Sequence, residues 1–151
     1  MKIQIFVSEA PANITTYQEA IRFAGNILVE KGTVQSSYVD TCIDRETDFP
    51  TGLSLANDKA VAIPHGDSEF VNISSISILR LINPVEFGRM ENKEQSVSCS
   101  FIFILALASS QQHINVLRKI VSFIQDDDFL NTCQVVNIEA AQELIEKKLV
   151  N

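Results

Sequence analysis

Five stretches of the chain show the apolar patterning of β-strands. Residues 3–7 and 75–78 alternate apolar with other side chains, the period of a strand that buries one face. Residues 97–107 are nearly all apolar or small, which is typical of a central strand covered on both faces. Residues 61–63 predict a further short strand, and residues 85–87 predict a short edge strand.

In the first third of the chain, apolar side chains at helical spacing predict two helices. One spans residues 16–31, and its first four residues fit a capping box. The other begins at Ser36 or Ser37 and ends before Pro50, because the residue that precedes a proline disfavours helix. The Thr51-Gly52 pair that follows is expected to form a turn.

Two further amphipathic helices are predicted in the last third of the chain. The first covers residues 110–125, and a serine of the Ser109-Ser110 pair can cap it. Residues 126–128 are three aspartates and predict a short turn or helix. The last helix covers residues 137–149, with Asn137 as its cap.

Strands interspersed with helices predict an α/β sandwich, in which a mixed, mostly parallel β-sheet is flanked by helices. The 151 residues suit one domain, residues 1–151, because no stretch has the composition of a linker or a repeat. Hydrophobic residues make up 46% of the chain, which disfavours disorder and allows a sizeable core.

Charge and cysteine content exclude several classes of function. The 19 acidic residues against 12 basic ones give a net charge of -7, which argues against nucleic-acid binding and against an acidic membrane surface. The three cysteines form no CxxC pair, so neither a disulfide framework nor a structural zinc site is expected. With no signal-peptide pattern and no bilayer-length apolar run, a cytoplasmic protein is expected.

His65 is the first candidate for chemistry. It follows a short apolar strand and lies between Pro64, which stiffens the backbone, and Gly66, which lets other groups approach closely. An imidazole is a good nucleophile near neutral pH and can carry a covalent intermediate. The spacing alone favours an ordinary histidine in a surface turn.

Two more residues are candidates for an anion site. His113 lies in the first turn of a predicted helix, where free N–H groups and the helix dipole favour an anion, although its position by itself favours an ordinary solvated histidine at a helix start. Arg45, near the end of the second helix, could clamp a phosphate or instead form a surface ion pair with Asp48. A metal site built from the two histidines would need Asp67 as a third ligand, and no ligand spacing supports one.

A combination of motifs resembles the enzyme IIA domains of the bacterial sugar phosphotransferase system, in their fructose–mannitol class. The motifs are the Arg45-Glu46 pair, the Thr51-Gly52 pair and the Ala62-Ile63-Pro64-His65 signature. The segment 111–117 is similar to the second histidine element of that family. Within the class, Phe49-Pro50-Thr51-Gly52 is most similar to the galactitol-specific branch, whereas His113 favours the mannitol and fructose branches.

The resemblance implies a phosphotransferase with a phosphohistidine intermediate at His65. The phosphocarrier HPr would supply the phosphoryl group, and a cysteine of enzyme IIB, which acts with the membrane enzyme IIC, would receive it. Arg45 and His113 would neutralise the moving charge, and an acidic rim would meet a basic face of HPr. No cofactor, nucleotide or metal is implied, and the sugar does not touch this domain.

A second function fits the same residues. Related IIA domains bind and control other proteins, with phosphorylation of the histidine as the signal. The two roles would use the same His65 site, so the motifs alone support a regulator as well as a carrier. A degenerate, purely structural module is disfavoured, because His65, Arg45 and His113 are all present.

Overall fold

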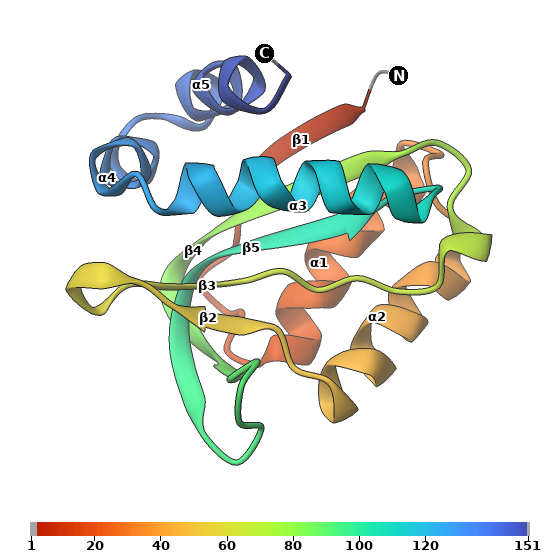
Figure 1. Ribbon diagram of the computed structural model, residues 1–151, viewed down its shortest axis with the longest axis horizontal. Coiled ribbons are helices and arrows are strands. Elements are labelled where there is room, and N and C mark those ends of the chain that lie inside the picture. The colour runs from red at the N-terminus through yellow and green to blue at the C-terminus, as the bar shows by residue number, and fades with distance from the viewer. Residues whose placement is uncertain (1–2, 151) are drawn as a thin grey trace.

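The computed structural model describes residues 3–150, which form one mixed β-sheet with helices on both of its faces (Figure 1). The five strands are β1 (Gln4–Glu9), β2 (Gly52–Ser54), β3 (Ala60–Ala62), β4 (Ser75–Gly88) and β5 (Ser96–Ala106). The helices are α1 (Tyr17–Glu30), α2 (Ser36–Asp48), α3 (Ser110–Ile124), α4 (Asp127–Val135) and α5 (Ile138–Val150). Two short 3-10 turns, η1 (Ala56–Asp58) and η2 (Ser68–Phe70), lie in the connections.

The strand order is β1-β4-β5-β3-β2. β1 is parallel to β4 and β3 is parallel to β5, whereas β4 is antiparallel to β5 and β2 is antiparallel to β3. The predicted mixed sheet flanked by helices is therefore confirmed. The expectation that it is mostly parallel is wrong, because the short connections from β2 to β3 and from β4 to β5 allow only antiparallel neighbours.

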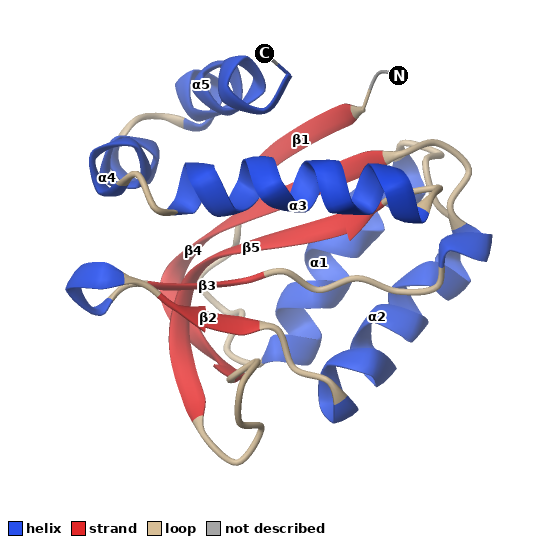
Figure 2. Cartoon of the chain, viewed as in Figure 1, coloured by secondary structure: helices blue, strands red, loops and turns tan. Residues whose placement is uncertain are grey.

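Strand β5 lies in the middle of the sheet and packs on both sides, as its apolar run predicts. Its odd-numbered residues Phe101, Phe103 and Leu105 face α3, α4 and α5, and its even-numbered residues Ile102 and Ile104 face α1 and α2. Figure 2 shows these two helical layers, one on each face of the strands. Because successive side chains of a strand point to opposite faces of the sheet, β5 contributes to two separate hydrophobic cores.

The predicted helix boundaries are confirmed closely. Thr16 caps α1 and forms a capping box with Glu19, as the sequence indicates. Ser109 caps α3 by accepting a hydrogen bond from the Gln112 N–H, and the Asn137 side chain accepts one from Ala140 N–H at the start of α5. Within residues 3–150, no helix is both long and apolar enough to cross a membrane.

The predictions for Thr51-Gly52 and for residues 85–87 are corrected. Gly52 opens strand β2, and the glycine is needed for a close approach, because a Cβ there would lie 2.5 Å from the carbonyl oxygen of Gly88. Residues 85–87 are not a separate strand but continue β4 beyond an irregularity between Arg80 and Val85. Both changes come from pairing with distant strands, which local patterning does not encode.

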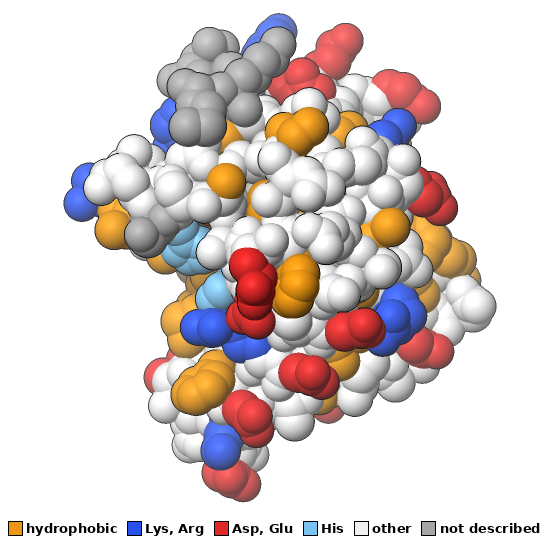
Figure 3. All heavy atoms as spheres, turned by 90° about the vertical axis from the view of Figure 1, so that its right-hand side faces the viewer, with side chains coloured by type: hydrophobic (Ala, Val, Ile, Leu, Met, Phe, Trp, Pro, Cys, Tyr) orange, Lys and Arg blue, Asp and Glu red, His pale blue; other side chains and the backbone are white. Residues whose placement is uncertain are grey.

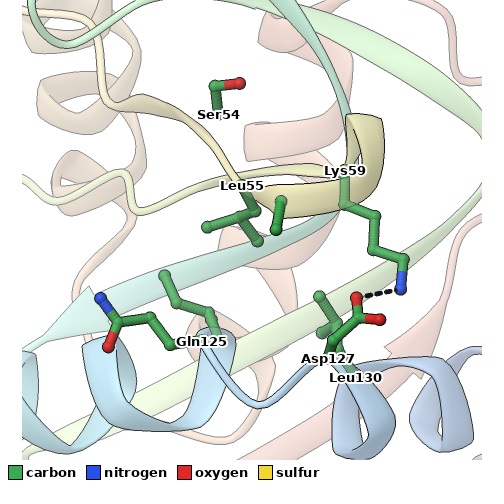
Figure 4. A pocket seen from close by; sticks show the side chains of 8 residues that line it. Ser54, Leu55, Lys59, Gln125, Asp127 and Leu130 are labelled. Carbon is green, nitrogen blue, oxygen red and sulfur yellow. Dashed lines mark hydrogen bonds and ion pairs between the residues drawn. The ribbon is translucent and has the colours of Figure 1, made fainter.

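The turn that joins β2 to β3 is anchored to the start of α4. The ammonium of Lys59 lies 2.5 Å from the carboxylate of Asp127, and the amide of Asn57 donates to the same side chain at 3.1 Å. Figure 4 shows Lys59 reaching across to Asp127, with Leu55 and Leu130 nearby. These contacts fix the beginning of β3, the strand that leads to His65.

Arg80 joins β4 to the end of α4. Its guanidinium donates to the carbonyl oxygens of Cys133 at 2.9 Å and Val136 at 2.6 Å, and it pairs with Glu9 at 2.8 Å. The last carbonyls of a helix have no partner within the helix, so a buried arginine there satisfies them. Only 12% of the Arg80 side chain is exposed, in contrast to 53% for Arg22, which pairs with Asp40.

Arg80→Met is expected to lower the free energy of unfolding by about 2–3 kcal/mol, because two carbonyl oxygens lose a charged donor. The matched control Arg22→Met removes an exposed pair and should change it by less than about 0.5 kcal/mol. Urea unfolding of both variants measures the difference. Equal losses in the two variants would contradict the capping role of Arg80.

Candidate active site

The two histidines of the chain meet at one edge of the sheet. His65 follows β3, and His113 lies in the first turn of α3, which follows β5. Because β3 and β5 are parallel, their carboxyl ends lie at the same edge and bring the two segments together. The ring centroids are 5.1 Å apart with an interplanar angle of 65°. The rings of His65 and His113, which are 48 positions apart in the sequence, therefore lie in edge-to-face contact.

Tyr38, a buried residue of α2, holds the loop that carries His65. Its hydroxyl donates to the carbonyl oxygen of Leu105 at 2.6 Å and accepts from the N–H of Gly66 at 3.1 Å. The N–H of Leu105 in turn donates to the carbonyl oxygen of Pro64 at 3.0 Å. One hydroxyl therefore ties the end of β5 to the residue after His65.

Thr41, one turn further along α2, makes the second attachment. Its hydroxyl accepts from the N–H of Asp67 at 3.1 Å. Gly66 passes so close to α2 that a Cβ there would lie 2.3 Å from the Thr41 hydroxyl oxygen. This confirms that Gly66 serves a close backbone approach, and the contacts with Thr41 fix the loop directly after His65.

The His65 imidazole is half-buried and held in one orientation. Its Nδ1 lies 3.2 Å from the carbonyl oxygen of Ile63, and because a carbonyl only accepts, Nδ1 is the protonated nitrogen of the neutral ring. Burial lowers the pKa of His65 below its ordinary value, and the nearby His113 and Arg45 lower it further. The ring is therefore neutral at neutral pH, with the lone pair on Nε2.

Arg45 occupies the last turn of α2, where it is exposed. Its guanidinium lies 6.0 Å from the centroid of the exposed Phe49 ring, a cation–π contact. Among the residues that the structure describes, Arg45 takes part in no ion pair, so the alternative of a pair with Asp48 is wrong. Its charge is available to an incoming anion.

An open pocket of about 650 Å³ brings these side chains together. Figure 3 shows the pale blue histidines at a hollow in the surface, with basic and acidic side chains beside them. Burial lowers the pKa of His113, and Arg45 lowers it further. The pocket lining includes Arg45, His65, Asp67, Ser109 and His113.

The pocket combines a neutral imidazole with groups that attract an anion. The guanidinium of Arg45, the ring of His113 and the N-terminal end of α3 all stabilise negative charge beside His65. Across residues 3–150, no three His, Cys, Asp or Glu side chains gather so that they could hold a metal ion. The arrangement suits nucleophilic attack on a phosphoryl group and stabilisation of the charge that arrives with it.

Glu46 and Thr51 are site-supporting residues to which the sequence assigned no role. The Glu46 side chain, 4% exposed, accepts from the N–H of Thr51 at 2.7 Å and from its hydroxyl at 2.9 Å. The same hydroxyl accepts from the N–H of Ile63, two residues before His65, at 3.1 Å. The feature of the sequence that points to them is their position in the motifs, Glu46 directly after Arg45 and Thr51 directly before Gly52.

Comparison with known families identifies the class of this protein. Residues 4–148 match the family model described as "Phosphoenolpyruvate-dependent sugar phosphotransferase system, EIIA 2". The chain belongs to this family of phosphotransfer components, as the motifs around Arg45 and His65 predict.

Known relatives agree with this assignment. The chain is 32% identical over 114 residues to the galactitol-specific EIIA component of Escherichia coli K12, covering 76% of this chain and 75% of that protein. It is 32% identical over 137 residues to the mannitol-specific enzyme IIA component of Halalkalibacterium halodurans, covering 89% and 85%. Enzyme IIAMtl of Escherichia coli, solved in complex with phosphorylated enzyme IIBMtl, shares the fold with a TM-score of 0.64 at 24% identity, covering 97% and 94%.

Glu46 is expected to make stability depend on pH. Burial raises its pKa from the ordinary value of 4.5 to about 7, against the lowering effect of the Thr51 hydrogen bonds. The folded protein then keeps a proton that the unfolded chain releases, so the stabilisation present below pH 4.5 is lost as the pH rises to about 7. The free energy of unfolding can fall by about 3 kcal/mol over this range.

Glu46→Gln removes the titrating group, so the free energy of unfolding should no longer decrease between pH 4.5 and 7. Urea unfolding measured at intervals across this range tests the expectation. If the curves of wild type and Glu46→Gln run parallel across that range, the carboxyl keeps an ordinary pKa in the folded protein and the interpretation is wrong.

Proposed function

We propose that this EIIA component carries a phosphoryl group on His65, accepting it from phospho-HPr and passing it to a cysteine of enzyme IIB. The convergence of His65, His113 and Arg45 around one pocket is the observation that carries the proposal. A histidine in a surface turn has no reason to face a second histidine and a free guanidinium. A phosphoryl acceptor needs both, because the transferred group brings negative charge.

The proposed acceptance step begins with the lone pair of His65 Nε2, since Nδ1 is protonated toward Ile63. Nε2 attacks phosphorus in line with the leaving group, the new P–N bond forms, and the bond from phosphorus to its carrier atom on HPr breaks. Arg45 and His113 stabilise the phosphoryl oxygens. The Nδ1–H···O bond then stabilises the positive charge that the substituted ring acquires.

In the second step, the thiolate of the enzyme IIB cysteine attacks phosphorus and the P–Nε2 bond breaks. His65 returns to its neutral form with Nδ1 still protonated, so the site is ready for another cycle. The complex of enzyme IIAMtl with phosphorylated enzyme IIBMtl, whose IIA fold this chain shares, supports such a partner.

Partner recognition has an electrostatic component in this proposal. Asp67 lines the pocket, and Asp44 and Asp48 are exposed on α2 close to Arg45 in sequence. With a net charge of -7, this rim suits a basic face of HPr. The protein would act in the cytoplasm with enzyme IIB and the membrane enzyme IIC, without contacting the sugar itself. The galactitol and mannitol relatives favour a hexitol as the sugar of the whole system.

His65→Ala should abolish phosphorylation, whereas His113→Ala should only slow it, by about 10–1000-fold, the usual effect of losing one positioned donor. Incubation with phosphoenolpyruvate, enzyme I and HPr, followed by intact mass, measures both. The His113→Ala protein should still reach a gain of one phosphoryl group at long times. An undiminished mass gain in His65→Ala would remove His65 as the acceptor.

Arg45→Lys keeps the positive charge but loses the planar fork that binds two phosphoryl oxygens at once. We expect transfer from phosphorylated protein to enzyme IIB to slow in Arg45→Lys and further in Arg45→Ala, by about 10-fold or more, since charged hydrogen bonds contribute about 1.5–3 kcal/mol. Rapid-quench transfer assays measure the rates. Transfer at the parental rate in Arg45→Ala would leave the guanidinium without a role.

A further inference from the structure

We propose that Glu46 and Thr51 form a positioning pair for His65, acting through the backbone of Ile63 to fix the tautomer and the direction of the nucleophile. The proposal rests on the proposed role of His65 and deepens it. Neither side chain touches the reacting atoms, so both are positioning residues. The proposal gives a physical role to two positions of the sequence motifs, Glu46 directly after Arg45 and Thr51 directly before Gly52.

The pair starts from a carboxylate that the fold buries at the end of α2. Glu46 is buried and accepts two hydrogen bonds from one residue, the backbone N–H and the hydroxyl of Thr51. A buried carboxyl group without partners is costly, so these two bonds strongly constrain where residue 51 lies. Glu46 thereby fixes the position of the Thr51 hydroxyl.

The Thr51 hydroxyl has one proton to donate and lone pairs that accept. Because its proton points to the acceptor Glu46, an oxygen lone pair is left to face the N–H of Ile63 at 3.1 Å. Strand β3 ends at Ala62, so the N–H of Ile63 lies beyond the paired strand and needs this partner. Glu46 therefore determines the direction in which Thr51 accepts.

Ile63 passes the constraint to His65. Its side chain is buried, its N–H is fixed by Thr51, and its carbonyl oxygen faces Nδ1 of His65 at 3.2 Å. Pro64, between them, limits rotation of the backbone. If the Ile63 backbone shifts, its carbonyl oxygen no longer accepts the hydrogen bond that keeps the proton on Nδ1 of His65. The imidazole ring is then no longer held in one orientation, and the lone pair on Nε2 no longer points in one fixed direction. Misplacement by about 1 Å can cost about 100-fold in rate.

The test compares Thr51→Val with Thr51→Ser. Valine has nearly the shape of threonine but leaves the Ile63 N–H and one Glu46 oxygen without the hydroxyl, whereas serine keeps it. We expect Thr51→Val to accept phosphate about 10–100-fold more slowly, and Thr51→Ser to stay within about 3-fold of wild type. In ¹⁵N NMR, Thr51→Val should lose the single Nδ1–H tautomer of His65, and Thr51→Ser should retain it.

Arg80→Met serves as the control for stability, because it weakens the fold far along β4 from the pocket. If Thr51→Val keeps both the wild-type rate and the wild-type tautomer, the positioning role is wrong. The positioning role is also wrong if Arg80→Met and Thr51→Val lower the free energy of unfolding equally and slow phosphorylation equally. The slower rate would then result from the loss of stability alone. The NMR readout needs no phosphorylation, so it tests the positioning pair even if His65 proves not to be the acceptor.

Discussion

The parallel pairing of β3 with β5 is the constraint on which the rest of the site depends. Both strands run toward the same edge of the sheet, so the loop after β3 and the helix after β5 begin side by side. His65 comes from the first and His113 from the second, which brings their rings to 5.1 Å. An antiparallel pairing would send one histidine to the opposite edge. β5 can hold this central place because both of its faces are apolar.

Two opposing electrostatic demands meet in the pocket. Before transfer, the proposed nucleophile must be neutral, and burial together with the charges of His113 and Arg45 lowers the pKa of His65. After transfer, a phosphoryl group with negative charge occupies the same space, and the Arg45 guanidinium stabilises it. Arg45 therefore has opposite effects on the two states of the ring, disfavouring its protonation and favouring its phosphorylation. An uncharged pocket could meet only the first demand.

Polar side chains of α2 and of the segment after it hold the loop that carries His65 in place. Tyr38 and Thr41 bind the backbone after His65, and Thr51, held by Glu46, binds the backbone before it. The Ile63 N–H is buried, and a buried backbone N–H without a partner costs about 1–3 kcal/mol, so the contact with Thr51 penalises any other path for the loop. The packing that buries α2 against the sheet is thus also what orients the imidazole.

The local features of the chain can be predicted from its sequence, because their partners lie a few residues apart. The capping box of Thr16 and Glu19, the Ser109 cap and the two-faced pattern of β5 depend on neighbours within one turn or one strand. The motifs also placed Arg45, His65 and His113 at the ends of elements. The balance of parallel and antiparallel pairs, the continuation of β4 past Arg80 and the strand at Gly52 depend on distant strands, so they emerge only in the folded chain. The same holds for the burial of the Glu46 carboxyl group against Thr51, because burial results from the packing of the whole chain and no short pattern encodes it.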